Sequence, residues 1–153
     1  MGFTIRYAVH PDHFKAMDTK QVRDAFLVDS LFEPDQIKMV YSHYDRLIVG
    51  GALPIKNGIS LETIDPLKSN YFLERRELGI VNVGGAGNII ADGVTYTLNY
   101  KDALYLSRGT KEVRFQPGDS AQPPYFYFNS TPAHVTYPAR KISFAEEIGR
   151  AHV

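Results

Sequence analysis

The sequence contains no cysteine, which excludes disulfide bonds and thiolate chemistry and fits a reducing compartment, so we expect a cytoplasmic protein. No apolar run approaches the roughly 18 residues of a membrane span. The first residues show no basic region followed by an apolar core, so no signal peptide is expected. Neither sign of charge is in excess: 17 basic and 17 acidic residues give a net charge of +0. This balance argues against nucleic acid or an anionic membrane as a partner.

The residues that are present indicate a chain built mainly of strands. A length of 153 residues allows one domain with a sizeable core and short tails. Alternating apolar residues over 3–9 predict an opening strand. Asp18 followed by Gln21 is a capping-box pattern, and it predicts one short helix over 19–28. Segment 37–49 is rich in β-branched and aromatic residues and predicts a long strand ending at two glycines.

The remainder consists of short apolar segments separated by turn residues. Asn57-Gly58 and Asp92-Gly93 are hairpin signals. Further strands are expected over Val94–Leu98, Ala103–Leu106, 113–115 and 125–128. Many strands with almost no helix predict an all-β sandwich or barrel. The proline-containing segment that follows has no clean periodicity, so we expect one domain over 1–130 and an extended connector over 131–146.

A glycine-rich turn at 83–87 invites comparison with a phosphate-binding loop. Such a loop needs G-x-G-x-x-G opening a helix, whose N-terminus faces the pyrophosphate. Here the third glycine position is Ile90 and the residues that follow are typical of a strand. We therefore expect these glycines to permit a tight turn between paired strands.

Segment 71–93 and segment 101–112 are similar to the two half-motifs of cupins, which are all-β barrels or jelly rolls. Glu77 occupies the position of the metal-binding glutamate in the first motif. The positions of the two preceding histidines hold Tyr71 and Leu73, or Asn70 and Phe72, depending on the spacing used. In the second motif Ser107 replaces the proline and Glu112 stands where histidine is expected. Both motifs have the expected turn residues but no histidine at the ligand positions, which predicts a cupin without its metal site.

Three residues remain as candidates for a functional site: His43, Arg75 and Glu77. His43 is expected on a strand face with Met39, Tyr41 and Asp45, as a catalytic residue or as a hydrogen-bonded or partly exposed strand histidine. In Glu74-Arg75-Arg76-Glu77 the strand period places Arg75 with Glu77 on one face and Glu74 with Arg76 on the other. One pair should point into the barrel, as a structural ion pair or as an arginine that binds the carboxylate of an acidic sugar.

Four strings carry a resemblance to a known family: MVYSHYDRLIVGGALPI, YFLERRELGIVNVGGAGNIIADG, KDALYLSRGTKEVRF and PAHVTYPARK. They closely resemble the N-terminal half of the 5-keto-4-deoxyuronate isomerases, also called 4-deoxy-L-threo-5-hexosulose-uronate ketol-isomerases, over about 7–141. The resemblance implies a two-cupin, homo-hexameric protein of pectin breakdown. It also implies conversion of 5-dehydro-4-deoxy-D-glucuronate to 3-deoxy-D-glycero-2,5-hexodiulosonate. The family's zinc is held by three histidines and a glutamate of the second cupin, so the resemblance implies no metal ligand in this chain.

The last residues depart from the family pattern. Segment 147–153, EIGRAHV, can be back-translated as GAG ATC GGA AGA GCA CAC GTC, the start of a common short-read sequencing adapter. We expect this tail to be adapter read-through, and the chain to be an inactive first half of an isomerase. The alternative is a stand-alone, non-catalytic cupin that binds an acidic sugar through Arg75 or Arg76.

Overall fold

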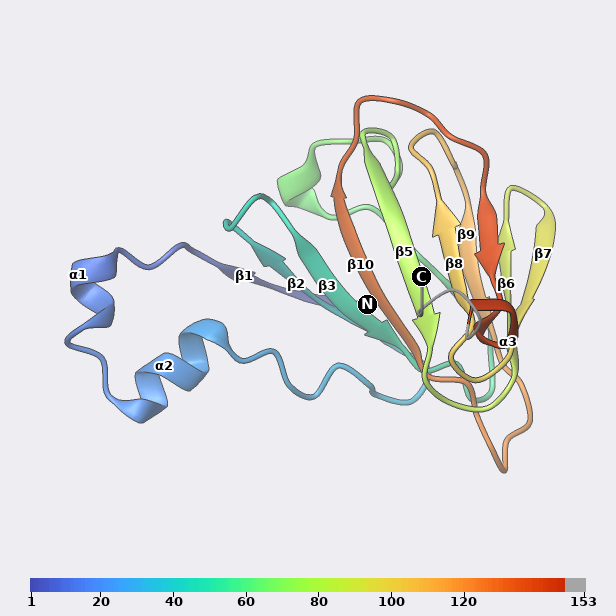
Figure 1. Ribbon diagram of the computed structural model, residues 1–153, viewed down its shortest axis with the longest axis horizontal. Coiled ribbons are helices and arrows are strands. Elements are labelled where there is room, and N and C mark those ends of the chain that lie inside the picture. Colours follow the sequence, from blue (N-terminus) through green and yellow to red (C-terminus); the bar gives the residue numbers. More distant parts are fainter. Residues whose placement is uncertain (148–153) are drawn as a thin grey trace.

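Two β-sheets facing each other make up most of the molecule. The computed structural model describes residues 1–147, so most of the tail predicted as read-through lies outside the described residues. One sheet has seven strands in the order β1-β2-β3-β10-β5-β8-β11, and the other has four in the order β4-β9-β6-β7 (Figure 1). The prediction of an all-β, cupin-type fold is confirmed.

The chain passes several times from one sheet to the other. The larger sheet consists of β1 (Gly2–Arg6), β2 (Ile37–Ser42), β3 (Ile48–Ala52), β10 (Phe126–Pro132), β5 (Arg76–Asn82), β8 (Ala103–Leu106) and β11 (Arg140–Ile142). The smaller sheet consists of β4 (Ile59–Ser60), β9 (Val113–Gln116), β6 (Gly87–Ala91) and β7 (Val94–Leu98). The helical elements are α1 (Pro11–Phe14), α2 (Thr19–Phe26), the 3-10 helix η1 (Asp65–Leu67) and α3 (Phe144–Glu147). The pair β1–β2 is parallel and the other strand pairs are antiparallel.

The core lies between the sheets, where alternate side chains of each strand meet. On β5 the buried apolar residues are Leu78 and Ile80, and on β10 they are Phe126 and Phe128. Phe115 of the smaller sheet contacts both phenylalanines, with ring centroids 5.5 and 6.0 Å apart. Each fully buried side chain of this size stabilises the fold by about 1.5–3 kcal/mol relative to exposure. This packing fixes the register, because a slip by one residue would turn the apolar row outward.

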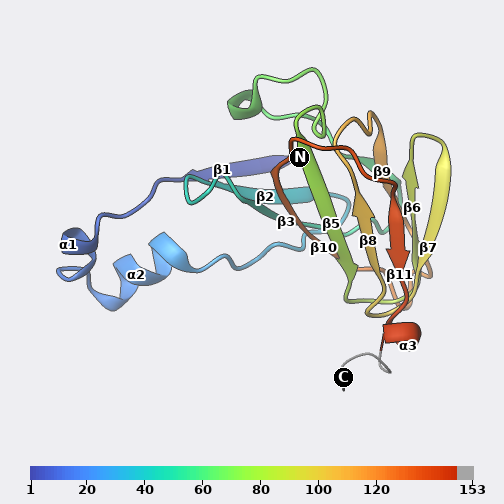
Figure 2. The same ribbon diagram turned by 45° about the horizontal axis from the view of Figure 1, so that its top comes forward.

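The N-terminal elements project away from the sheets, as Figures 1 and 2 show for α1 and α2. The capping box predicted from Asp18 and Gln21 is present and starts α2. Neither helix has a buried residue. The sequence predicted one helix here, and the structure has two. Among the described residues, no helix combines the length and the apolar character needed to cross a membrane.

The prediction of one long strand over 37–49 is wrong. This segment belongs to a hairpin of two antiparallel strands, β2 and β3. Asp45 and Arg46 at its turn have φ angles of 51° and 55°, and the Leu47 N–H donates to the Tyr44 carbonyl at 3.1 Å. These values describe a type I′ turn, which normally uses Asn-Gly. The two glycines expected to end the strand lie inside β3 instead.

Of the two predicted hairpin signals, one is confirmed and one is wrong. Asp92-Gly93, with φ angles of 45° and 81°, joins β6 to β7. Asn57-Gly58 joins no hairpin, because β3 and β4 lie in different sheets. The turn at 83–86 also crosses between sheets, from β5 to β6, so it does not join paired strands as predicted. A Cβ on Gly85 would lie 1.8 Å from the Gln122 carbonyl oxygen, so close approach of two backbones requires this glycine.

The segment expected as a connector contributes to the larger sheet. Strand β10 runs on to Pro132, and β11 pairs antiparallel with β8 through Lys141 and its neighbours. Asp102 secures this end by accepting hydrogen bonds from the Phe144 N–H at 3.1 Å and the Asn99 N–H at 3.0 Å. Residues 131–132 and 140–142 therefore belong to strands of the larger sheet, and 133–139 form an irregular segment between them.

Candidate functional site

His43, the first predicted site residue, lies beyond the end of β2 and is exposed. Its ring stacks on Tyr7 with centroids 4.5 Å apart and meets Tyr41 edge-on at 5.4 Å. The neighbouring Tyr44 hydroxyl accepts a hydrogen bond from the Val9 N–H at 2.8 Å. The expected position of His43 on a strand face is wrong because the chain turns after Ser42. The contacts of His43 hold the N-terminal segment against the sheet.

Glu77 points away from the core. Its carboxylate accepts a 2.8 Å hydrogen bond from the Tyr105 hydroxyl on the outer face of the larger sheet. Burial raises the pKa of Tyr105; the Ser107 side chain opposes this shift and Glu77 adds to it, so the phenol stays protonated as a donor. A metal held between the sheets would need inward donors, and the inward positions next to Glu77 are Arg76 and Leu78.

The described residues do not fit a metal ion. Residues 1–147 contain no group of three histidine, cysteine, aspartate or glutamate side chains that could hold one. Glu112, the other predicted ligand position, is exposed, and its N–H donates to Asp92 at 2.8 Å. No reaction step can therefore be assigned to a metal held by this part of the protein.

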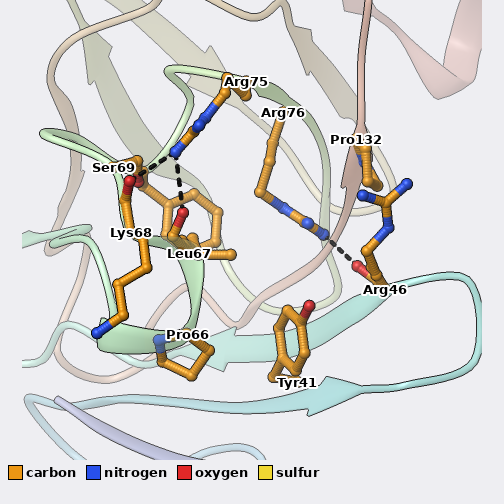
Figure 3. Close-up of a pocket in the computed structure, with 10 residues that line it drawn as sticks. Tyr41, Arg46, Pro66, Leu67, Lys68, Ser69, Arg75, Arg76 and Pro132 are labelled. Carbon is orange, nitrogen blue, oxygen red and sulfur yellow. Dashed lines mark hydrogen bonds between the residues drawn. The ribbon is translucent and has the colours of Figure 1, made fainter.

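The site that the structure does assemble is a pocket of about 290 Å³ at one end of the core. Tyr41 on β2 and Arg76 on β5 lie at the ends of their strands' inward rows. The loop that contains η1 covers this end, and the β2–β3 turn adds Arg46. The lining consists of Tyr41, Arg46, Pro66, Leu67, Lys68, Ser69, Phe72, Arg75, Arg76 and Pro132 (Figure 3). It contains four basic side chains and no acidic one.

Arg76 is the buried member of this group, with 5% of its surface exposed. Its Nε donates to the Ser130 hydroxyl at 3.1 Å, and its Nη2 donates to the Ser130 and Arg46 carbonyls at 2.7 and 2.6 Å. Burial, together with the charge of Arg46, lowers its pKa to about 10, while Tyr41 acts in the opposite direction. The group remains a cation at neutral pH.

Arg75 lies at the rim and is exposed. Its Nη2 donates to the carbonyls of Leu67 and Lys68 at 3.1 and 2.6 Å, which ties the rim to the η1 loop. Lys68 has a φ of 45° and directs its Nζ to Asp65 at 2.5 Å. The predicted pairing of Arg75 with Glu77 on one strand face is wrong, because β5 begins only at Arg76. Of the other predicted pair, Glu74 and Arg76, only Arg76 points inward. Glu74 lies outside the core, where it accepts a hydrogen bond from the Asn70 N–H.

Sequence reasoning found Arg75 and Arg76 but missed Arg46 and Lys68. The four residues come from three separate segments of the chain, so no long basic run marks the pocket. One usable signal was present: Arg76 shares its two-residue phase with Leu78 and Ile80, which places it inward. Val81 makes this pattern ambiguous, because it places an apolar residue on the opposite face of β5 as well.

Comparison with known proteins identifies relatives. No protein-family model matches the chain. The 4-deoxy-L-threo-5-hexosulose-uronate ketol-isomerase of Formosa agariphila is 53% identical over 141 residues, covering 92% of this chain and 50% of that protein. The enzymes of the same name from Bacteroides fragilis and Yersinia pestis are 49% identical over 147 and 144 residues. By sequence, the chain is similar to these ketol-isomerases over nearly its whole length.

The match has a defined extent. The chain spans about half the length of the ketol-isomerases it matches. The match with the Bacteroides fragilis protein covers 96% of this chain and 52% of that protein. The match with the Yersinia pestis protein covers 93% of this chain and 52% of that protein. Among solved structures, an RmlC-like cupin protein from Desulfovibrio desulfuricans superposes with a TM-score of 0.46 at 15% identity. That superposition covers 70% of this chain and 92% of that one. The predicted family resemblance is confirmed by the sequence matches.

Proposed function

We propose that this chain is the N-terminal cupin half of a uronate ketol-isomerase. The observation that carries the proposal is an identity of 49–53% to three ketol-isomerases over 92–96% of the chain. The substrate would be 5-dehydro-4-deoxy-D-glucuronate and the product 3-deoxy-D-glycero-2,5-hexodiulosonate. Such an aldose–ketose exchange moves hydrogen between neighbouring carbons, and a metal assists it by polarising the oxygens.

In this proposal the catalytic zinc belongs to the other half of the protein. The described residues present no set of side chains that fits a metal. The role of this half would be to support the second cupin and to build a homo-oligomer, a hexamer by analogy with the family. Exposed apolar side chains on the projecting N-terminal segment, Phe14 and Phe26 at 47% and 45%, support an assembly role. The cytoplasmic location stays a prediction from the cysteine-free composition.

The competing proposal is a stand-alone binding module for an acidic sugar. A module of this kind would need a final strand to close its sheet, and β11 supplies one beside β8. Long-read sequencing of the source gene beyond the codon for Glu146 separates the two proposals. A second cupin with clustered histidines and a glutamate is expected for the isomerase. A stop codon after Val153, covered by genomic reads, would favour the module.

A further inference from the structure

The three arginines of the pocket retain donors that the protein does not use. Within residues 1–147, no acceptor is bonded to Nη1 of Arg76, to Nε or Nη1 of Arg75, or to the guanidinium of Arg46. None of the three forms an ion pair with a carboxylate in that part of the chain. Lys68 differs, because its charge is paired with Asp65.

The free donors lie around one cavity. Figure 3 shows Arg75 and Arg76 entering the pocket from the same side, with the Tyr41 hydroxyl directed toward the Arg76 guanidinium. Arg76 is buried, with 5% of its surface exposed, and it lines the pocket; its unbonded Nη1 is not among the fully buried atoms without a partner, so it keeps some accessible surface. A buried cation without an anionic partner is unfavourable, and an incoming anion would remove that penalty.

Strained backbone marks the same place. Arg46 and Lys68 both line the pocket with φ angles of 55° and 45°, in the left-handed region that residues with a Cβ adopt only at a cost in free energy. Such strain persists where surrounding contacts hold it, and here the carbonyls of both residues are held by arginines of the pocket. The contacts therefore fix the arginines before any ligand arrives.

We propose that this pocket is a binding site for a small sugar acid, whose carboxylate is held by the free donors of Arg46, Arg75 and Arg76. A planar guanidinium matches a carboxylate with two parallel hydrogen bonds. The apolar lining, from Leu67, Phe72 and Pro132, offers surface for the C–H face of a sugar ring. The proposal requires only the pocket, so it holds whether the chain is half of an isomerase or a separate module.

The test is a titration of the purified chain by calorimetry and by NMR of the arginine side-chain N–H groups. The ligands are D-galacturonate, D-galactose, which has no carboxylate, and inorganic phosphate. We expect D-galacturonate to bind at least tenfold more tightly than D-galactose, and to shift the Arg76 signals. Equal affinity for the two sugars, or no binding of D-galacturonate, would overturn the proposal. Binding of phosphate without D-galacturonate would overturn the choice of a sugar acid.

Exposed variants keep the test independent of folding. Arg75→Gln and Arg46→Gln should each weaken D-galacturonate binding by about tenfold or more, since a charge-assisted hydrogen bond is lost. Arg114→Gln is the matched control, because Arg114 is an exposed arginine on β9 in the other sheet. An equal loss of binding in the Arg114→Gln variant would show general charge attraction and would contradict the site.

Discussion

The Arg76 guanidinium donates a 2.6 Å hydrogen bond from Nη2 to the backbone carbonyl of Arg46, across 30 positions of sequence. The donor is buried at the start of β5, and the acceptor is strained at the tip of the β2–β3 hairpin. This bond joins two walls of the pocket and places two positive charges side by side. It is the contact on which the stability of the hairpin tip and the shape of the pocket both depend.

Relieving the strain at the hairpin tip should stabilise the fold. Arg46→Gly places a residue without a Cβ at a φ of 55°, so we expect the free energy of unfolding to rise by about 1 kcal/mol. Part of the gain is offset by the greater freedom of glycine in the unfolded chain. Urea unfolding measures the change. Arg46→Ala is the control, since it removes the guanidinium but keeps a Cβ at the positive φ angle. If the glycine variant is less stable than the alanine variant, the positive φ of residue 46 does not destabilise the fold.

Removing the buried donor should have the opposite effect. Arg76→Met leaves the Arg46 and Ser130 carbonyls without their partner, and we expect a loss of about 2–4 kcal/mol in unfolding free energy. Arg75→Gln, at an exposed site, should cost less than about 1 kcal/mol. The comparison uses urea unfolding of both variants. Similar costs for the two would mean that the Arg76 hydrogen bonds contribute little.

The sequence predicted the sheets better than it predicted the pocket. Short apolar segments between turn residues marked most strands, and Asp92-Gly93 marked a turn whose positive φ angles favour glycine. The β2–β3 turn escaped notice because Asp45 and Arg46 adopt the same conformation without glycine. Asn57-Gly58 is a hairpin signal, but the strands on either side of it, β3 and β4, pair with other strands in different sheets. Local patterns do not contain the sheet order, which long-range packing decides.

The site was harder to predict for a related reason. Arg46, Lys68 and the Arg75-Arg76 pair come from three segments that meet only after folding. The overall charge of +0 conceals this local concentration. Motif spacing gave Glu77 the position of the cupin metal-ligand glutamate, and the phase of strand β5 places its side chain on the outer face of the sheet. Motif spacing identifies a position, whereas burial decides the direction of its side chain.

Acid should weaken the closure of the C-terminal end of the sheet through Asp102. Burial alone would raise its pKa, but hydrogen bonds from the Asn99 and Phe144 N–H groups, and Lys141, hold the pKa below its usual value. A carboxyl with a lowered folded pKa contributes stability above its unfolded pKa, about 3.9, and loses it as the pH falls through the folded value. The Asp102 contribution should therefore be complete at pH 6 and reduced near pH 3.

The variant Asp102→Asn isolates that contribution. An amide keeps the shape but has one acceptor atom, so one of the two N–H donors loses its partner. We expect a cost of about 1–3 kcal/mol at pH 6 in urea unfolding, and a smaller difference from the unmodified protein at pH 3. A difference that stays constant between the two pH values would contradict the assignment to the Asp102 carboxylate.

Zinc should not remain bound to this chain. The described residues offer no cluster of three ligands, so after incubation with zinc and dialysis we expect far less than one zinc per chain by elemental analysis. Removal of metal with EDTA should leave the melting temperature unchanged. Glu77→Gln is the matched variant, since it replaces the one carboxylate of the first motif. Near-stoichiometric zinc that is lost in this variant would show that Glu77 is a metal ligand and would contradict this prediction.

The central claim is tested most directly by completing the enzyme. Residues 1–146 are joined to the matching second half of the Formosa agariphila ketol-isomerase, and turnover of 5-dehydro-4-deoxy-D-glucuronate is measured with zinc present. The chain alone and the second half alone are the controls. The proposal predicts turnover by the joined protein and none by the chain alone. Turnover by the chain alone, or a folded, zinc-loaded joined protein without activity, would contradict the assignment of this chain as the N-terminal half of the isomerase.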